Sequence, residues 1–346
     1  MTDQALPTPV KYRSWNVLSL AGKNEESKRH LLCYQVGLYG FHLVCLQETR
    51  IVSKPDYFVP NWGKSKWSDL GETRGCFYHF ANSSTEVTKT GGKAGVGFAW
   101  RHEIVRCREF WSISSRLCWG LFEPQRPGGS KSFIALSCYA LTKGNKEETM
   151  KFYLDLDFLL VKLKKRFKKQ HFYIAGHFNT SFGDSAIYLG KPITHFHSAR
   201  ANMRTNWNAR KFLQFVKRKG FRAVNIEKKC AKQKKDEVRS SEDTWSHPKT
   251  KCSSLKDLLI TSSTCYKQVQ LCTPLGPWHR RMLSDHCPIM WELDRETQKS
   301  KNKTRTSRPT SRREMLVTAL NPVSWGKIKQ LTVMQTTRDL ILPWRN

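Results

Sequence analysis

Five polar residues stand beside short apolar segments of the chain, and their types could carry out hydrolysis. They are Glu48, His177, Asp257, Asp285 and His286. Carboxylate oxygens suit Mg²⁺, a hard cation that keeps several waters and needs few protein ligands. A neutral imidazole can accept a proton, and an acidic neighbour fixes its tautomer and raises its basicity. These side chains are therefore of the kinds that metal-assisted hydrolysis uses.

Each of these positions also has an ordinary structural explanation when it is taken alone. A buried strand that ends in Gln-Glu is common, so Glu48 alone would be a surface or capping residue. Tyr139, an aromatic residue at a strand end, would usually pack in the core. Asp285 could cap a helix. A catalytic interpretation therefore depends on whether the residues occur in an order that belongs to a known family.

Such an order is present, and it resembles the endonuclease/exonuclease/phosphatase superfamily over almost all of the first 294 residues. Five blocks match the motifs of that family: Ser14-Trp15-Asn16-Val17, Leu46-Gln47-Glu48-Thr49, Cys138-Tyr139-Ala140-Leu141-Thr142, Asp257-Leu258-Leu259-Ile260 and Ser284-Asp285-His286. Leu141 stands where the family usually has proline. Because five separate blocks in one order rarely arise by chance, the superfamily fold is expected.

The resemblance implies a metal site and a phosphate site. Glu48 would bind Mg²⁺, or alternatively Mn²⁺, with Asp285 as a second metal ligand. Asn16 would help to hold both the metal and the scissile phosphate. Tyr139, Asn179 and His286 would contact the phosphate. Asp257 would orient His286. Water would attack in line and leave a 3′-hydroxyl and a 5′-phosphate.

One position departs from the family pattern. The family loop runs Gly-Asp-Phe-Asn, whereas this chain has Gly176-His177-Phe178-Asn179. The family aspartate orients and deprotonates the attacking water. His177 can accept a proton when neutral, but it brings no negative charge to a cation, and losing a positioned base costs about 10²–10⁴-fold in rate. Asp184 is the nearest downstream carboxylate that could compensate.

Finer blocks resemble the endonuclease domain of RTE-type non-LTR retrotransposons and the related craniofacial development protein 2-like proteins. These blocks are Ala94-Gly95-Val96-Gly97-Phe98-Ala99, Ile113-Ser114-Ser115-Arg116-Leu117, Asn206-Trp207-Asn208-Ala209 and Asp243-Thr244-Trp245-Ser246-His247-Pro248. By this resemblance Asn208 would contact DNA or phosphate. The implied substrate is therefore duplex DNA or an abasic site in it.

The charge of the chain agrees with a nucleic-acid partner. Lys and Arg number 60 against 28 Asp and Glu, which gives a formal net charge of +32. A surface this basic gathers polyanions with an affinity that falls as salt rises, and enzymes of small metabolites rarely need it. The lysines between residues 162 and 169 either contact DNA or form a solvated helix face. The basic segment 299–313 is compatible with nuclear import, with DNA contact or with a solvated linker, and we expect a nuclear protein.

Helices that alternate with apolar strands predict an α/β fold. Apolar residues recur at helical spacing from Phe152 to Phe167 and lead into a strand at 172–175. A helix at 24–38 would precede a strand at 43–46, and a helix at 208–219, stopped by Gly220, would precede a strand at 221–224. The family resemblance specifies two β-sheets packed face to face with helices on their outer faces, a four-layer α/β sandwich.

The expected domains are an N-terminal extension at 1–11, the endonuclease/exonuclease/phosphatase-like domain at 12–294, and a basic, disordered tail at 295–346. The 11 cysteines show no zinc-like spacing, so we expect reduced thiols. No signal peptide or membrane span is visible, so an intracellular protein is expected. Nothing in the sequence points to a protein partner, and a monomer is expected.

Three functions remain open at this level. The first is a Mg²⁺-dependent DNA endonuclease, weakened by His177. The second is a catalytically inactive protein with a nuclease fold that binds nucleic acid through its basic surface. The third, a phosphatase or deadenylase of the same fold, is less favoured because the finer blocks match retrotransposon endonucleases.

Overall fold

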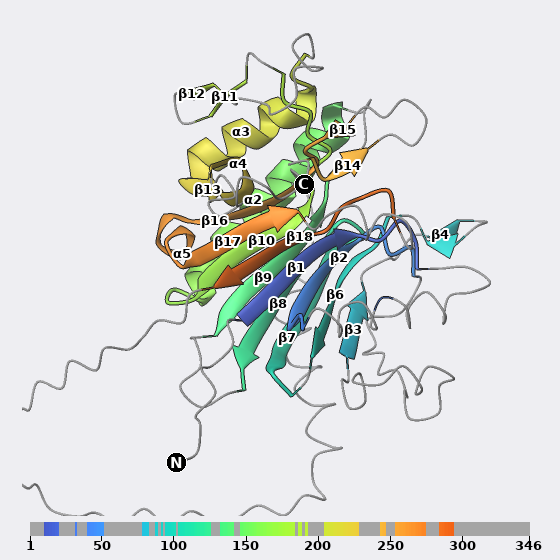
Figure 1. Ribbon diagram of the computed structural model, residues 1–346, viewed down its shortest axis with the longest axis vertical. Coiled ribbons are helices and arrows are strands. Elements are labelled where there is room, and N and C mark those ends of the chain that lie inside the picture. Colours follow the sequence, from blue (N-terminus) through green and yellow to red (C-terminus); the bar gives the residue numbers. More distant parts are fainter. Residues whose placement is uncertain are drawn as a thin grey trace, which may run out of the picture. The chain divides into compact units, whose positions relative to one another are not determined.

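Two six-stranded β-sheets form the centre of the computed structural model (Figure 1). The first has the order β17-β18-β1-β2-β6-β3, and the second has the order β13-β16-β10-β9-β8-β7. The strands of the first sheet are β1 (Val10–Asn16), β2 (Leu43–Gln47), β3 (Tyr78–Asn82), β6 (Val96–Arg101), β17 (Val269–Pro274) and β18 (Ile289–Leu293). Those of the second are β7 (Val105–Ser114), β8 (Leu117–Pro124), β9 (Phe133–Tyr139), β10 (His171–His177), β13 (Phe221–Ala223) and β16 (Asp257–Ser262).

The structure describes part of the 346-residue chain. The described residues are 10–20, 32, 40–51, 78–82, 87–88, 91–92, 94–101, 103–125, 132–141, 146–183, 186–188, 191–192, 204–227, 243–246, 253–274 and 284–293. All of them belong to one structural unit, Met1–Thr297. The predicted tail at 295–346, Asp184 and all of the predicted helix at 24–38 except Leu32 lie outside the described residues.

Smaller elements complete the described part. The helices are α2 (Lys146–Arg166), α3 (Trp207–Lys219), α4 (Val224–Glu227) and α5 (Ser263–Tyr266). Three short strand pairs join β4 (Val87–Thr88) to β5 (Gly91–Gly92), β11 (Ile187–Tyr188) to β12 (Lys191–Pro192), and β14 (Trp245–Ser246) to β15 (Ser253–Ser254). No helix among these residues is long and apolar enough to cross a membrane.

Three apolar clusters hold the layers together. Between the sheets, aromatic side chains from both sides interdigitate, as where Tyr12 of β1 packs edge to face on Phe133 of β9 with ring centroids 5.2 Å apart. The outer face of the second sheet is covered by α2 and α3, which Figure 1 shows on one side of that sheet. On the outer face of the first sheet, Trp15 and Leu46 pack with the helical residue Leu32. The predicted four-layer α/β sandwich is therefore confirmed.

Local signals explain where α3 starts and stops. The side chain of Asn206 accepts a hydrogen bond from the backbone N–H of Ala209, which satisfies a free donor of the first turn. Gly220 ends the helix in the left-handed region at φ 63°, where a side chain would be strained. The predicted helix at 208–219 is confirmed within one residue. The strand after it stops at Ala223, because Val224 begins α4.

One boundary differs from the sequence expectation. β1 begins at Val10 and pairs Val10 with Leu293, so the sheet includes residues that were assigned to an N-terminal extension ending at residue 11. β16 begins at Asp257, the first residue of the Asp257-Leu258-Leu259-Ile260 block. The carboxylate consequently lies at the end of the sheet, where neighbouring strands also end or begin.

Candidate active site

Strand register brings three of the predicted residues side by side at one edge of the second sheet. His177 ends β10, and its partner in the parallel neighbour β9 is Tyr139. Its partner in the antiparallel neighbour β16 is Asp257. Because side chains of paired residues point to the same face of a sheet, the three side chains come from the same surface. The rings of Tyr139 and His177 have centroids 5.5 Å apart.

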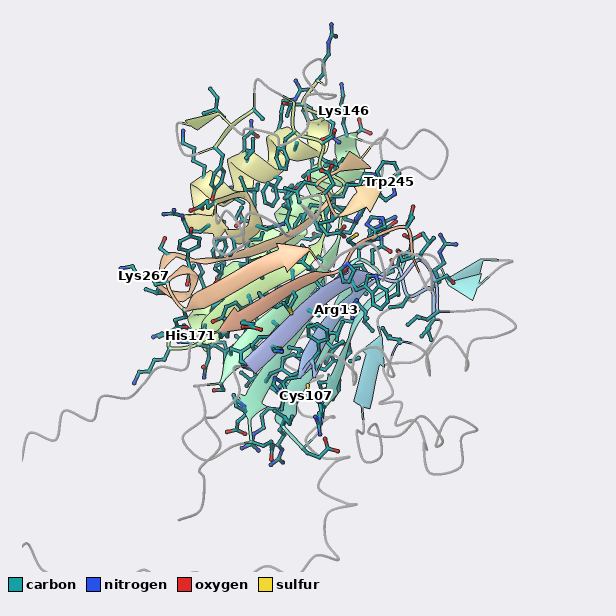
Figure 2. All side chains as sticks on the ribbon, viewed as in Figure 1. Arg13, Cys107, Lys146, His171, Trp245 and Lys267 are labelled. Atoms are coloured by element: carbon teal, nitrogen blue, oxygen red, sulfur yellow. The ribbon has the colours of Figure 1, made fainter. Side chains whose placement is uncertain are left out.

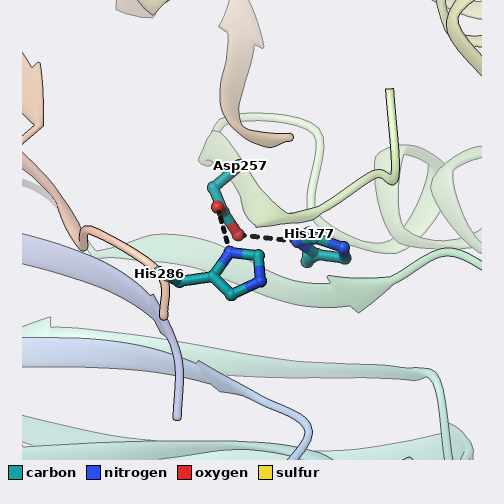
Figure 3. Close-up of side chains that lie close together, drawn as sticks. All are labelled: His177, Asp257 and His286. Carbon is teal, nitrogen blue, oxygen red and sulfur yellow. Dashed lines mark hydrogen bonds and ion pairs between the residues drawn. The ribbon is translucent and has the colours of Figure 1, made fainter. Parts of the chain in front are cut away.

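Two histidines share the carboxylate of Asp257 (Figure 3). His177 Nδ1 lies 3.0 Å from Asp257 Oδ1, and His286 Nδ1 lies 2.8 Å from Asp257 Oδ2. The two imidazole rings meet edge to face with centroids 4.6 Å apart. The three residues are buried, with exposed fractions of 3%, 4% and 1% in the order His177, His286 and Asp257. The predicted pairing of Asp257 with His286 is thus present, and His177 joins it.

The charge of Asp257 determines which imidazole nitrogens carry protons. Burial raises the pKa of this carboxyl group, but the two histidines outweigh burial and hold the pKa below its usual range. The group is therefore ionised and can only accept hydrogen bonds. Both Nδ1 atoms must then be donors, which leaves the Nε2 atoms as the proton acceptors of neutral His177 and His286. The same logic orients imidazoles in hydrolases that pair histidine with aspartate.

Backbone and side-chain bonds from the segment around Thr244 hold this cluster in place. The hydroxyl of Thr244 accepts a bond from the backbone N–H of Asp257, at 2.9 Å. The next residue, Trp245, forms an isolated β-bridge with His286. Its indole Nε1 donates to Asp285 Oδ2 at 2.7 Å. These contacts hold five residues from three segments of the chain next to one another.

Glu48 follows β2 on the other sheet, and its carboxylate already has protein partners. Asn16 Nδ2 donates to Oε2 at 3.2 Å, and Arg50 Nη2 donates to Oε1 at 2.5 Å. Glu48 and Arg50 adopt positive φ values of 57° and 53°. Backbone strain of this kind persists where surrounding structure over-determines a loop, and it clusters at functional sites. Asn16 and Glu48, which were predicted to lie together, are in contact. The guanidinium of Arg50 also bonds to Glu48.

Tyr139 connects the Glu48 group to the histidine cluster. Burial, followed by the charge of Glu48, raises the pKa of the phenol, and the Tyr139 hydroxyl hydrogen-bonds to that carboxylate. The phenol consequently stays protonated and acts as a donor. The guanidinium of Arg116 lies over the Tyr139 ring, 5.1 Å from its centroid. Arg116 Nη1 is buried and has no hydrogen-bond partner among the described residues.

Asn179 and Asn208 lie next to the site but use their amides to position the chain. Asn179 Nδ2 donates to the carbonyl of Ala140 at 2.7 Å. Asn208 is 5% exposed, and its Nδ2 donates to the carbonyl of Leu141 while its Oδ1 accepts from Thr149. Both amides thus fasten the segment after β9. Contact of Asn208 with DNA stays a prediction.

The oxygen donors at the site are compatible with a divalent cation. Mg²⁺ is usually held by one or two carboxylates and keeps several waters, which Glu48 can provide. Asp285 Oδ1 is buried without a hydrogen-bond partner among the described residues, and it lies 3.7 Å from His286 Nε2. His177, Asp257 and His286 also place one potential ligand atom each within 4.8 Å of one another. The carboxylates fit a hard ion, and the imidazoles would suit a softer one.

Two cationic residues of the site were not predicted from the sequence. Arg50 follows Glu48 by two positions, and no local pattern marks it as the partner of that carboxylate. Arg116 lies in the Ile113-Ser114-Ser115-Arg116-Leu117 block, so its match to the family block was a usable signal. The opposite end of β10 carries another polar pair, in which His171 Nδ1 lies 2.9 Å from Cys265 Sγ. Figure 2 shows His171 far from Trp245, at the other end of the strands.

Comparison with known proteins supports the fold. No protein-family model and no curated protein matches the sequence. An AP endonuclease from Archaeoglobus fulgidus matches with a TM-score of 0.53 and 15% identity, covering 82% of this chain and 99% of that one. The endonuclease domain of TRAS1, a telomere-specific non-LTR retrotransposon, has a TM-score of 0.51 and 8% identity, covering 83% and 99%.

A third structure bears the family name in its description. It is an endonuclease/exonuclease/phosphatase family protein from Bacteroides thetaiotaomicron, with a TM-score of 0.51 and 16% identity, covering 83% of this chain and 98% of that one. Each of the three structures aligns with 82% or 83% of this chain. The chain therefore has the fold of the endonuclease/exonuclease/phosphatase proteins.

Proposed function

We propose that this chain is a divalent-metal-dependent nuclease that nicks DNA, with His177 acting as the general base. The single observation that carries the proposal is the hydrogen bond between His177 and Asp257. An isolated histidine in place of the family aspartate would be a poor substitute. A histidine whose Nδ1 donates to a buried carboxylate has a fixed tautomer and a more basic Nε2.

In the proposed reaction, His177 Nε2 accepts a proton from a water molecule while the water oxygen forms a bond to phosphorus. The bond between phosphorus and the 3′-oxygen breaks, and that oxygen takes up a proton from solvent. The products are a 3′-hydroxyl and a 5′-phosphate. Asp257 stabilises the imidazolium that forms, because its carboxylate remains ionised.

In this proposal three side chains would hold the phosphate. The hydroxyl of Tyr139 remains a donor, and the half-buried Arg116 beside it offers an Nη1 group with no protein partner among the described residues. His286 would donate from Nε2 when it is protonated. Buried charged donors act strongly on a developing charge, because little water competes with them.

The metal in this proposal is Mg²⁺, with Mn²⁺ as an alternative, and Glu48 and Asp285 would hold it. When bound, such an ion polarises the phosphate and stabilises the charge that develops on it. Arg50 must release Oε1 of Glu48, or share the carboxylate, for this to occur. We also propose that the protein acts in the nucleus, on the basis of its basic segment at 299–313.

Cations and aromatic rings near the site provide a surface for DNA. Asn206, at the start of α3, donates to the carbonyl of Asn179, so the next residue, Trp207, lies beside the active-site loop. The Nζ atom of Lys211 lies 4.6 Å from the centroid of the Trp207 ring. On another segment, Lys256 Nζ lies 3.3 Å from the centroid of Trp245. Such groups bind the phosphate backbone without reading sequence.

A second function, DNA binding without turnover, is favoured by the Arg50–Glu48 ion pair. This pair holds the permanent positive charge of Arg50 beside the carboxylate that a metal would need, with 2.5 Å between Arg50 Nη2 and Glu48 Oε1. The basic surface would then hold nucleic acid while the metal site stayed closed. The two candidates differ in whether any metal concentration produces cleavage.

Nicking of supercoiled plasmid by the purified chain tests the proposal. We expect nicking in Mg²⁺ or Mn²⁺ that is lost in Glu48→Ala and falls by about 10²–10⁴-fold in His177→Ala. His177→Asp should retain or raise the rate, because it restores a carboxylate. Arg50→Ala should lower the metal concentration needed for half-maximal nicking, since it frees Glu48.

The matched control is His171→Asp, which makes the same exchange at the opposite end of β10 and should leave nicking unchanged. If the native chain never nicks at any Mg²⁺ or Mn²⁺ concentration while His177→Asp does, the chain is a binding protein. If neither nicks but both retain DNA at low salt, the nuclease proposal fails and the binding function stands.

A further inference from the structure

Helix α2 has a second apolar face, which is directed away from the sheets. Its inner face packs in the core through Phe152, Leu156, Leu159, Leu160 and Leu163. On the opposite side stand Met150, Leu154, Phe158 and Val161, with exposed fractions of 37%, 57%, 58% and 56%. We call these four residues the outer stripe. They are four of the eight large apolar side chains that are exposed in the described part of the chain.

The spacing of the outer stripe makes it continuous. Steps of four, four and three residues stay on one side of an α-helix, so the four side chains follow one another along about three turns. A solvated helix face would carry polar residues at these positions. Contiguous apolar surface on a soluble domain marks a site where another molecule binds. One cation borders the stripe, because Lys162 Nζ lies 4.3 Å from the centroid of the Phe158 ring.

Opposite charges stand at the two ends of the same face. Glu147 lies three residues before Met150, and Lys165 lies four residues after Val161, so both share the side of the stripe. Both are exposed. The first turn of α2 is acidic and the last turn is basic. The stripe is therefore polarised, with a negative end and a positive end at similar distances from its middle.

We propose that the outer stripe binds the outer stripe of a second copy of this chain, with the two α2 helices antiparallel. A two-fold axis through the middle of the stripe would place Met150 opposite Val161 and Leu154 opposite Phe158 of the other copy. The same axis would place Glu147 of each copy opposite Lys165 of the other. A surface that complements itself in both shape and charge under a two-fold rotation is what a symmetric dimer requires.

The charges favour a second copy over an unrelated apolar partner. Antiparallel pairing joins the acidic end of one helix to the basic end of the other, whereas parallel pairing would put like charges together. The antiparallel arrangement also aligns the helix dipoles favourably. One helix face is small beside the surface that stable dimers bury, so the dimer should be weak and should dissociate on dilution.

Sedimentation equilibrium of the full chain between about 1 and 100 µM tests the proposal, because this range brackets a weak dimer. We expect a monomer–dimer equilibrium. Phe158→Glu should raise the dissociation constant at least about tenfold, since it puts a charge in the middle of an apolar contact. Ile187→Glu is the matched control: Ile187 is also an exposed apolar residue, at 63%, but lies in β11, and its variant should dimerise normally.

Charge exchange tests the antiparallel register. Glu147→Lys alone and Lys165→Glu alone should each weaken the dimer about threefold or more, because each places like charges opposite one another. The double variant should regain the native dissociation constant. Circular dichroism checks that each variant keeps its helix content.

Several outcomes would overturn the proposal. A native chain that is monomeric over the whole concentration range removes it, and so does a Phe158→Glu variant that dimerises as the native chain does. Failure of the double variant to recover removes the antiparallel arrangement. Binding of the monomeric native chain to anionic lipid vesicles, lost in Phe158→Glu, would assign the stripe to a membrane surface instead.

Discussion

At the scale of single residues, Asp257 is the side chain on which the site depends. Each of its two carboxylate oxygens accepts a hydrogen bond from a different histidine. Its ionised state makes both Nδ1 atoms donors and so fixes both tautomers. His177 is therefore not an isolated imidazole. It creates a second histidine–carboxylate pair on the same acid.

Asp257→Asn tests this dependence. An amide offers one oxygen acceptor, so one histidine must face an N–H group, and we expect a loss of about 2–4 kcal/mol at neutral pH. Because the pKa of Asp257 is lowered by folding, its stabilisation is present above the ordinary carboxyl pKa and is lost as the pH falls through the folded value. Urea unfolding from neutral pH to about pH 3 should show the native chain approaching the variant.

The control for this prediction is Asp155→Asn on α2, which removes a carboxylate far from the histidines and should have a small effect at every pH. A difference between the native chain and Asp257→Asn that stays constant down to low pH would contradict the idea that the ionised carboxylate is the source.

At the scale of elements, the close approach of β9 and β10 aligns the strand ends that carry the candidate site. Gly176 of β10 stands opposite Cys138 of β9, and a Cβ atom on Gly176 would overlap the backbone carbonyl of Cys138. The next pair along is Tyr139 with His177. Glycine at this position therefore allows the two strands to pack closely at the point where they deliver their functional side chains.

Gly176→Ala should push the two strands apart and destabilise the chain by about 1–3 kcal/mol, the usual cost of inserting a methyl group into a packed core. Nicking or DNA retention should fall more than stability alone predicts, because His177 moves relative to Tyr139. Gly120→Ala in β8 is the control. Its Cβ would meet the buried ring of Phe122 at 2.7 Å and the backbone oxygen of Glu109 at 3.4 Å, so this variant adds a core clash away from the β9–β10 pair. Equal losses in both variants would argue against a specific role for Gly176.

At the scale of the whole molecule, polar bonds join the two sheets close to the site. Gln47 Nε2 of the first sheet donates to Ser137 Oγ of the second at 3.0 Å, and this hydroxyl donates to the carbonyl of Leu46 at 2.8 Å. Glu48 follows Gln47 directly, so the carboxylate from one sheet is held near the histidines of the other. The chain as a whole has a net formal charge of +32.

This charge predicts a strong salt dependence of DNA binding. With several phosphate contacts, the dissociation constant for a labelled duplex should rise about 10³-fold between roughly 50 and 200 mM salt. Lys211→Ala, beside Trp207 at the catalytic edge, should lower the slope of log affinity against log salt by about one unit or less. Fluorescence anisotropy measures both quantities.

Lys162→Ala on α2 is the control, because the carboxyl-terminal half of α2 leads into the start of β10, at the edge opposite His177. For Lys162→Ala, the slope of log affinity against log salt should match the native value. A larger change for Lys162 than for Lys211 would place the DNA on the outer helices rather than over the catalytic edge.

The sequence by itself determined the fold and most of the residues of the candidate site. Apolar strands that alternate with helices, the cap and stop residues of α3, and the ordered polar blocks are local patterns. Local patterns can be recognised without coordinates, because helix and strand periods arise from backbone geometry. Asn16, Glu48, Tyr139, Asp257 and His286 are predicted because they stand in blocks that resemble the motifs of the family. The positive charge also followed from composition alone.

The tertiary structure alone decided how these residues are connected. His177 and Asp257 are 80 residues apart, and they meet because β10 and β16 pair in one register out of many. Arg50 takes an oxygen of Glu48 through a loop with positive φ, which no sequence pattern announced. The outer stripe of α2 is exposed because the second sheet covers the opposite face of this helix. Contacts across strands and the choice of buried face depend on the whole fold, and the sequence signals for them are not local.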